Sequence, residues 1–354
     1  MKILYLITGL GGGGAEKVVC DLADQMLLKG HVVKIAYLKG KEPVVIPNLN
    51  NIETIYLGLE SVGQFYKSCQ LYRKLISNFK PDVIHAHMVH ANIFARLNRI
   101  FKPIPKLICT AHSSNEGGSL RMLAYKLTNF LSDFDTNVSQ KARDEFVEKG
   151  AFSVKSSFIY NGINLDKFKK VECSTSPSSK FNMIAVGRLN YAKDFPNLIH
   201  AIKLVVDQGY SNISLSIVGE GEERSNLESL IQHLNLNEII SLLGRRDDIA
   251  ELMNNSELFI LSSIFEGFGL VVAEAMACDT FVVSTNCGGV KEVMGDTGIL
   301  VDPQNSQALA DGIIKVMNMS AHSIADNNRK ALERIKKNFD LNSVVAQWLE
   351  IYEK

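Results

Sequence analysis

The chain has 354 residues, no formal net charge at pH 7 and 46% hydrophobic residues, which is typical of a globular protein with two domains. No apolar run approaches the length of a membrane span, and the six cysteines form no C-x-x-C pair, which excludes a transmembrane protein and a cysteine-based scaffold. We therefore expect a cytoplasmic protein with reduced thiols. The charge is uneven: residues 1–165 hold 20 Lys/Arg against 13 Asp/Glu, and residues 166–354 hold 18 against 25.

Strand-like and helix-like segments alternate through the first half. The apolar run 2–8 predicts a buried strand, and the apolar residues after it have helical spacing up to Gly30, a helix-capping residue. Further strands are predicted at 31–38, 81–87, 106–112, 134–139 and 156–163, with helical stretches between them. A β-α-β succession of this kind predicts a parallel sheet with helices on both faces.

A polar, Ser/Pro-rich run at 171–180 interrupts the alternation, and the pattern then restarts. Strands are predicted at 182–189, 214–221, 239–244, 258–263 and 280–285, and helices at 195–209, 247–255 and 270–278. We predict an α/β protein of two Rossmann-like domains, residues 1–170 and 171–338, that face each other across a cleft. The last helix, within 339–354, is expected to close the second domain or, as we favour, to pack back on the first.

The segment EGFGLVVAEA carries Glu266 and Glu274 where a strand passes into a helix. Glycines before a helix N-terminus expose N–H groups at the positive end of the helix dipole, which suits a phosphate. Glu274 lies two turns further on, roughly on the same face, where it can accept hydrogen bonds from sugar hydroxyls. The alternative is a pair of ordinary capping acids, but the Gly-Phe-Gly sequence favours a binding site.

The segment VGRLNYAKDFPNLI places Arg188 and Lys193 between a strand and a helix. Two cations at this position can clamp a diphosphate and neutralise the charge that develops on a leaving group. Surface Arg and Lys are common, yet the position after a strand favours the functional interpretation.

Together these two segments resemble the retaining glycosyltransferases of family 4, which have the GT-B fold. The resemblance spans nearly the whole chain, with the elements in the family's order; the other matching segments include GGAEKVV, DVIHAH, CTAHSS, IYNGINLDKF, IVGEGEERSNLESL and GGVKEVMGDTGILVDP. Bacterial members that build polysaccharides are the most similar in kind. The resemblance implies transfer of a sugar from a nucleotide donor to a glycan acceptor.

The resemblance also implies roles for individual residues. Arg188 and Lys193 would hold the donor diphosphate, Glu266 would contact the donor sugar, and Glu274 would bind the ribose. His112 would contact a sugar hydroxyl or line the reaction centre, so that the implied catalytic set is His112, Glu266, Arg188 and Lys193. The remaining implied contacts are the turn Gly267, Phe268, Gly269 and Leu270, the base-binding Gly244 and Arg245, the loop Gly12, Gly13 and Gly14, and, on the acceptor side, His87 and Asn161.

We expect no metal and no cofactor. His85 and His87 lie on one side of a strand, but no further ligand type completes a metal site. Asp133 and Asp135 form an Asp-x-Asp pair, which we interpret as scaffold. The two cations and a helix dipole can neutralise the leaving group without a metal.

Residues 90–130 contain six Lys/Arg against one acid, Glu116, and the segment SLRMLAYKLTNFL interleaves cations with apolar residues. A basic amphipathic surface suits docking on anionic lipid headgroups; a core-facing helix with solvated lysines is the alternative. We favour docking at the inner face of the cytoplasmic membrane and an acceptor linked to a polyprenyl diphosphate. No nucleic-acid partner is expected.

The predicted function is therefore transfer of a hexose or N-acetylhexosamine, with retention, from a donor that is UDP-linked in the family's commoner case. The first alternative is a non-hydrolysing nucleotide-sugar 2-epimerase of the same architecture. A dinucleotide oxidoreductase is disfavoured: Gly9, Gly11 and Gly14 spell G-x-G-x-x-G, but the second strand ends at Lys39-Gly40-Lys41 without the ribose-binding acid. A degenerate, non-catalytic binding scaffold is the third alternative.

Overall fold

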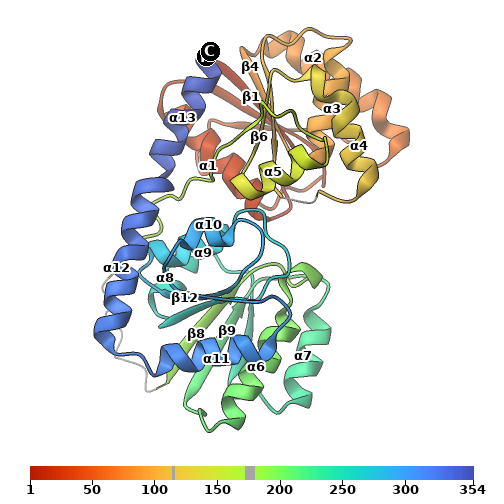
Figure 1. The fold of residues 1–354 in the computed structure, drawn as a ribbon. Helices are drawn as coiled ribbons and strands as arrows, with labels where there is room; N and C mark the ends of the chain where they lie inside the picture. Colours follow the sequence, from red (N-terminus) through yellow and green to blue (C-terminus); the bar gives the residue numbers. More distant parts are fainter. Residues whose placement is uncertain (114–115, 172–179) are drawn as a thin grey trace. The chain divides into compact units, whose positions relative to one another are not determined.

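The structure is a computed structural model that describes residues 1–113, 116–171 and 180–354. The chain divides into two compact units: unit 1 comprises Met1–Gly162 and Leu341–Lys354, and unit 2 comprises Ile163–Asp340. The domain boundaries expected from the sequence lie at 170 and 338, and most of the polar run 171–180 lies outside the described residues. Each unit is a parallel sheet with helices packed against it (Figure 1), so the predicted α/β class is confirmed.

Unit 1 contains a seven-stranded parallel sheet in the order β3-β2-β1-β4-β5-β6-β7. Its strands are β1 (Lys2–Gly9), β2 (Val32–Lys39), β3 (Glu53–Tyr56), β4 (Val83–His87), β5 (Leu107–Ala111), β6 (Phe134–Asn137) and β7 (Ser157–Phe158). Its helices are α1 (Gly14–Leu28), α2 (Phe65–Phe79), α3 (Val89–Arg99), α4 (Ser119–Thr128), α5 (Gln140–Glu148) and α13 (Leu341–Glu353), with 3₁₀ turns η1 (Val62–Gln64) and η2 (Asn129–Leu131). The strand order reverses between β1 and β4, which is where ligands bind in such sheets.

Unit 2 repeats this order in a six-stranded parallel sheet, β10-β9-β8-β11-β12-β13. Its strands are β8 (Phe181–Val186), β9 (Ile213–Val218), β10 (Ile240–Gly244), β11 (Leu258–Leu261), β12 (Phe281–Thr285) and β13 (Ile299–Val301). Its helices are α6 (Phe195–Asp207), α7 (Arg224–His233), α8 (Ile249–Asn254), α9 (Leu270–Ala277), α10 (Val290–Met294), α11 (Ser306–Met317) and α12 (Ala321–Asn338), with the 3₁₀ turn η3 (Tyr191–Lys193). The order reverses between β8 and β11.

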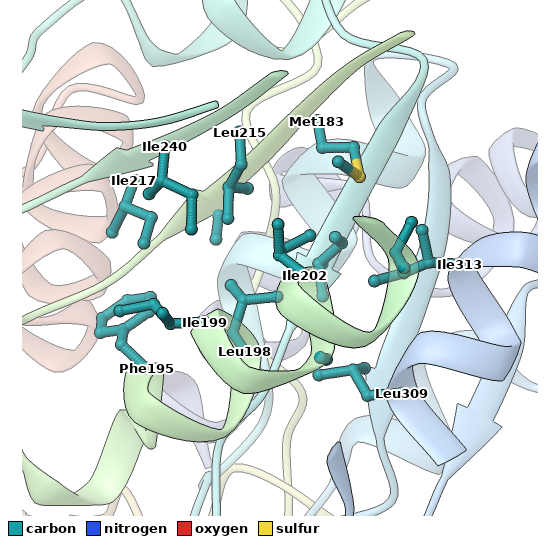
Figure 2. Packing of buried hydrophobic residues seen from close by; sticks show 14 of the residues in the cluster. Met183, Phe195, Leu198, Ile199, Ile202, Leu215, Ile217, Ile240, Leu309 and Ile313 are labelled. Atoms are coloured by element: carbon teal, nitrogen blue, oxygen red, sulfur yellow. The ribbon is translucent and has the colours of Figure 1, made fainter. Parts of the chain in front are cut away.

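The core of unit 2 shows why these segments fold as they do. Pro196 in the first turn of α6 lacks only an N–H that the helix would leave unpaired anyway. The apolar face of α6, including Leu198 and Ile202, packs between the sheet residues Leu215 and Ile217 and the α11 residues Leu309 and Ile313 (Figure 2). This packing fixes the loop between β8 and α6, which carries Arg188 and Lys193.

The C-terminal helix α13 belongs to unit 1. The hydroxyl of Tyr352 lies 2.6 Å from Nδ1 of His85 and 3.2 Å from the hydroxyl of Tyr5, and all three side chains are buried. The ring of Trp348 packs 4.4 Å from that of His85. The end of the chain is therefore fastened to β1 and β4. The strand order of unit 1 reverses between these two strands, and we call such a position the switch point of a sheet.

Candidate functional site

The ion pair of Lys193 and Glu266 is the centre of the candidate site in unit 2. Lys193 ends the turn η3 after β8, and Glu266 follows β11, so the two residues come from the strands that flank the switch point. Oγ of Ser263 donates a 2.8 Å hydrogen bond to the same carboxylate oxygen of Glu266. Both side chains of the ion pair remain partly exposed, at 19% and 13%. The sequence-predicted pair is thus brought together where a ligand can reach it.

Backbone contacts hold the two loops against each other. The amide of Ile264 donates to the carbonyl of Ala192 (2.9 Å), and Oγ of Ser262 donates to the carbonyl of Lys193 (2.8 Å). Gly288 packs so closely on the carbonyl of Glu266 that a Cβ there would collide with it. The position of Glu266 is therefore fixed by the backbone of neighbouring loops as well as by its ion pair.

The turn after Glu266 leads into helix α9. Gly269 precedes the helix with φ 89°, a left-handed conformation that favours glycine. Phe268 is buried and its ring packs on Phe339, so its side chain is not presented to a ligand. Glu274 is only 4% exposed. It lies on the helix as expected, but within the protein interior.

The other predicted donor residues lie along the same edge of the sheet. Arg188 follows β8 and is exposed. Gly244 ends β10, its carbonyl accepts from the amide of Gly219 (2.8 Å), and the next residue, Arg245, is exposed. The loops after β10, β9, β8 and β11 thus form one continuous row.

In unit 1, the structure brings His87, His112 and Asn161 together. Nδ1 of His87 lies 2.9 Å from Nε2 of His112. All three residues line a small cavity of about 10 Å³, close to the space of one water molecule, together with Val18 and Leu22 of α1. Nε2 of His87 is buried without a partner among the described residues.

Both imidazoles are neutral at physiological pH. Burial lowers the pKa of His112 to about 4, and burial with the nearby His85 and His112 holds the pKa of His87 well below its usual range. A neutral pair can share one proton in a hydrogen bond, which fixes the tautomer of each ring relative to the other. Because His87 is only 1% exposed, it contacts His112 and the cavity rather than bulk solvent.

The glycine loop precedes α1. Gly12 has φ 96° and is exposed, whereas Gly13 is extended and Gly14 begins the helix. A Cβ on Gly13 would run into the carboxylate of Glu16. The loop follows β1, so it flanks the switch point of unit 1 just as the loop of Lys193 flanks that of unit 2.

Two of the six basic residues in the stretch 90–130 form ion pairs within the protein, and one of them is buried. Arg96 is fully buried and its guanidinium pairs with Asp135 at 2.6 Å. Arg99 pairs with Asp133 at 2.7 Å, so both members of the Asp-x-Asp pair have arginine partners in the scaffold. The expectation that these cations form a charged surface is wrong for Arg96, because the segment folds with acids from η2–β6 that sequence spacing does not reveal.

Among residues 1–113, 116–171 and 180–354, no group of three His, Cys, Asp or Glu side chains is arranged to hold a metal ion. Metal independence stays a prediction. Within the same residues, no helix is both long and apolar enough to pass through a lipid bilayer.

Sequence reasoning missed two features of the site. Ser263 contacts Glu266 but is one of many serines in the chain. Glu116 accepts hydrogen bonds from the amide of His112 and from Tyr125 (2.8 and 2.6 Å). Its only signal was that it is the single acid among six cations.

Comparison with known families assigns each half of the chain to a glycosyltransferase domain, in agreement with the two Rossmann-like sheets. Residues 12–167 match the family described as Glycosyltransferase Family 4, and residues 166–338 match Glycosyl transferases group 1. The protein is a glycosyltransferase, and the chain belongs to glycosyltransferase family 4.

Curated relatives match along most of their own length. An N-acetylgalactosamine-N,N'-diacetylbacillosaminyl-diphospho-undecaprenol 4-alpha-N-acetylgalactosaminyltransferase from Campylobacter jejuni is 27% identical over 95% of this chain and 96% of its own. The amylovoran biosynthesis glycosyltransferase AmsD from Erwinia amylovora is 26% identical, over 96% and 92%.

A solved structure shows the same fold. Anabaena Alr3699/HepE in complex with UDP-glucose superposes with a TM-score of 0.85 at 23% identity, covering 100% of this chain and 99% of that one. The predicted GT-B fold is thereby confirmed.

Proposed function

We propose that the protein transfers a hexose or N-acetylhexosamine from a UDP-sugar, with retention of configuration, to a lipid-linked glycan in bacterial surface polysaccharide synthesis. The observation that carries the proposal is the Lys193–Glu266 pair at the switch point of unit 2, in a family-4 chain. The relative from Campylobacter jejuni acts, by its name, on an undecaprenol-diphosphate-linked glycan and makes an α-linkage. The HepE complex shows that this fold holds UDP-glucose.

The row of loops in unit 2 fits an extended nucleotide sugar. Neighbouring strands lie about 4.8 Å apart, so the three steps from β10 to β11 span roughly 14 Å. In this proposal Gly244 and Arg245 lie along the base. Glu274, although only 4% exposed, takes the ribose with the part of its side chain that reaches the surface. Arg188 and Lys193 hold the diphosphate.

The sugar lies at Glu266, whose carboxylate accepts from its hydroxyls, with the backbone of Gly267 to Leu270 beside the phosphate. During transfer the bond from the anomeric carbon to the phosphate oxygen breaks, and a bond to the acceptor oxygen forms on the same face. The acceptor proton passes to the departing phosphate oxygen. Lys193 and Arg188 stabilise the charge on the leaving diphosphate, so no metal is required.

Glu266 is poorly suited to act as a covalent nucleophile. Its carboxylate already accepts from the Lys193 ammonium and from Ser263, which lowers the electron density available for attack. This supports a same-face substitution without a glycosyl-enzyme. Detection of a glycosyl adduct on Glu266 by mass spectrometry would refute that mechanism.

The activity test offers the purified protein a panel of UDP- and GDP-sugars, with and without a polyprenyl-diphosphate-linked acceptor. We expect acceptor-dependent release of UDP and an α-linked product. Lys193→Ala should lower kcat by about 100-fold or more, since it removes one preorganised charge from the leaving group. Lys203→Ala serves as the matched control: this half-buried lysine of α6 also has an acidic partner, Asp207. Donor isomerisation without acceptor would identify the 2-epimerase instead, and an unchanged Lys193→Ala variant would indicate a non-catalytic scaffold.

The acceptor's lipid implies a membrane-facing surface, and we assign it to helix α4. Four exposed apolar side chains form what we call the α4 stripe: Leu120 (81% exposed), Leu123 (49%) and Leu127 (64%) on α4, and Phe130 (80%) in the following turn η2. Exposed apolar patches of this kind mark interaction surfaces. The helix carries Arg121 and Lys126 and no acid, which suits an anionic lipid surface. In this proposal the apolar side chains of the α4 stripe make the main contact with the membrane, whereas the sequence analysis assigned that contact mainly to basic side chains.

A vesicle experiment tests this surface separately from activity. The wild type should sediment with phosphatidylglycerol vesicles, and Leu127→Glu should reduce the bound fraction at least about threefold because it puts a charge in the headgroup–acyl boundary. Leu28→Glu changes an equally exposed leucine on α1 and is the control. Equal binding by the two variants would contradict the assignment.

A further inference from the structure

The side chain of Glu116 joins three elements around His112. One carboxylate oxygen accepts from the backbone amide of His112 at 2.8 Å, directly after β5. The other accepts from the hydroxyl of Tyr125 on α4 at 2.6 Å. The carboxyl group also receives the backbone amide of Val89, the first residue of α3. No other side chain described in this structure bonds to the amide of His112.

The partners of Glu116 are themselves fixed. Tyr125 is fully buried, and its oxygen also accepts from Nδ2 of Asn92 at 2.8 Å. Asn92 in turn donates to the carbonyl of Thr110 on β5. The carboxyl group at the start of α3 lies at the positive end of an eleven-residue helix, which offsets part of the cost of burying its anionic form. Besides the amide of His112, the partners of Glu116 thus lie on the helices α3 and α4.

The ring of His112 has a second attachment, independent of Glu116. Its Nε2 is hydrogen-bonded to Nδ1 of His87 at 2.9 Å. Met88, between β4 and α3, has φ 71°, an uncommon conformation for a residue other than glycine, and its amide bonds to the carbonyl of Thr110. The backbone and the ring of His112 are therefore fixed from different sides. Among the described residues Nδ1 has no hydrogen-bond partner, so it is the ring nitrogen that we assign to a ligand.

We propose that Glu116 is a positioning residue for the transfer reaction: with His87 it forms a two-point clamp that sets the location and tautomer of His112. The inference rests on the proposed function, together with the role that the family resemblance implies for His112: contact with a sugar hydroxyl or a place at the reaction centre. Glu116 does not touch substrate. It acts by fixing the backbone of His112, and a shift of about 1 Å in such a group costs roughly 100-fold in rate.

Three variants separate this role from simple stabilisation. Glu116→Gln keeps the size of the side chain but replaces one of its two acceptor oxygens by an amide nitrogen. Tyr125→Phe keeps the buried ring and removes only the hydroxyl that orients Glu116. Glu148→Gln, on the exposed face of α5, is the matched control. Each variant is accepted for kinetics only if its melting temperature shows that it is folded at the assay temperature.

We expect Glu116→Gln and Tyr125→Phe to lower kcat about tenfold or more, with the Kd for UDP unchanged because the proposed nucleotide contacts lie in unit 2. In ¹⁵N-histidine-labelled protein, the ring signals of His112 should shift in both variants, and those of His200 in unit 2 should not. Glu148→Gln should match the wild type in every measurement.

Three results would overturn the inference. If both variants keep kcat within twofold of the wild type while His112→Ala abolishes transfer, Glu116 has no positioning role. If His112→Ala itself transfers sugar normally, the proposed role of His112 fails, and the clamp has nothing to position. A loss of UDP affinity in Glu116→Gln would also contradict it, because the effect would then lie outside unit 1.

Discussion

Gly12 and Gly13 are adjacent, but a side chain is unfavourable at each of them for a different physical reason. Gly12 needs its positive φ, whereas Gly13 is extended and has no conformational need for glycine. What Gly13 avoids is a Cβ against Glu16 in the first turn of α1. A substitution at Gly12 would therefore strain the backbone, whereas one at Gly13 would add a side chain to the loop without straining it.

We predict that Gly13→Val lowers transfer at least about tenfold and leaves the fold intact, because its branched side chain occupies the loop that the family resemblance assigns to the donor phosphate and the acceptor. Steady-state kinetics and a thermal melt measure the two effects. Gly30→Ala at the other end of α1, where φ is 83° and a Cβ meets open space, is the control: it should cost about 1 kcal/mol of stability and no activity. Normal activity in Gly13→Val would show that the loop does not meet the substrates.

A second residue-scale prediction concerns pH. Burial raises the pKa of the Glu116 carboxyl to about 7, against the lowering effect of its hydrogen bonds from Tyr125 and His112 and of the nearby Arg121. Because this pKa lies above that of the unfolded chain, the folded chain binds more protons between about pH 4.5 and 7, and its free energy of unfolding falls as the pH rises through that window.

Glu116→Gln cannot ionise, so its stability relative to the wild type should rise by about 1–3 kcal/mol between pH 5 and pH 8. Urea denaturation at the two pH values measures the difference. A constant difference between variant and wild type would mean that Glu116 does not titrate in this range.

The sequence was informative about candidate site residues that directly follow a strand. Lys193 and Glu266 follow β8 and β11, and the end of a strand can be recognised from the sequence alone. Glu116 and Ser263 act through partners that only the folded chain supplies. Arg96 was wrongly predicted: its charge indicated a surface position, but in the folded chain it is buried and pairs with Asp135.

At the scale of elements, long apolar runs were predictable and short ones were not. The final helix was expected within 339–354 and is α13, Leu341–Glu353. The strands β3 and β13 were not predicted, because three or four half-buried residues carry too little periodicity to separate from a loop. The strand expected over 156–163 is the two-residue β7, since only Ser157 and Phe158 pair with β6.

Helix α13 also yields an element-scale prediction. Its Tyr352 hydroxyl satisfies His85 and Tyr5 inside unit 1, and burial holds the pKa of His85 well below its usual range, so the ring stays neutral. Tyr352→Phe should destabilise unit 1 by about 1–3 kcal/mol, since it leaves buried polar groups without a partner. Denaturant unfolding measures the loss. The exposed Tyr66→Phe is the control, and equal stability of the two variants would show that α13 is fastened by apolar packing alone.

At the scale of the whole molecule, the two units repeat one strand order, yet the proposed contacts divide between them. Unit 2 carries the nucleotide contacts, and unit 1 carries His112 and the α4 stripe. The opposite charges of the two halves of the sequence are in keeping with this division, because an anionic lipid surface favours the more basic half. The repeated fold was predictable from the restart of the β-α-β pattern after residue 180, whereas the division of tasks depended on the side chains at each switch point.

Hydrogen exchange tests this division in one experiment on the full chain. Because a ligand protects the amides that it orders, UDP should slow exchange in the loops 187–193 and 264–270 of unit 2, and phosphatidylglycerol vesicles should slow it in 119–131 of unit 1. Lys193→Ala should weaken the first effect and leave the second intact, while Leu127→Glu should do the opposite. If either variant abolished both effects, or if UDP protected α4 as strongly as the loop of Glu266, the assignment of donor and membrane surface to different units would be wrong.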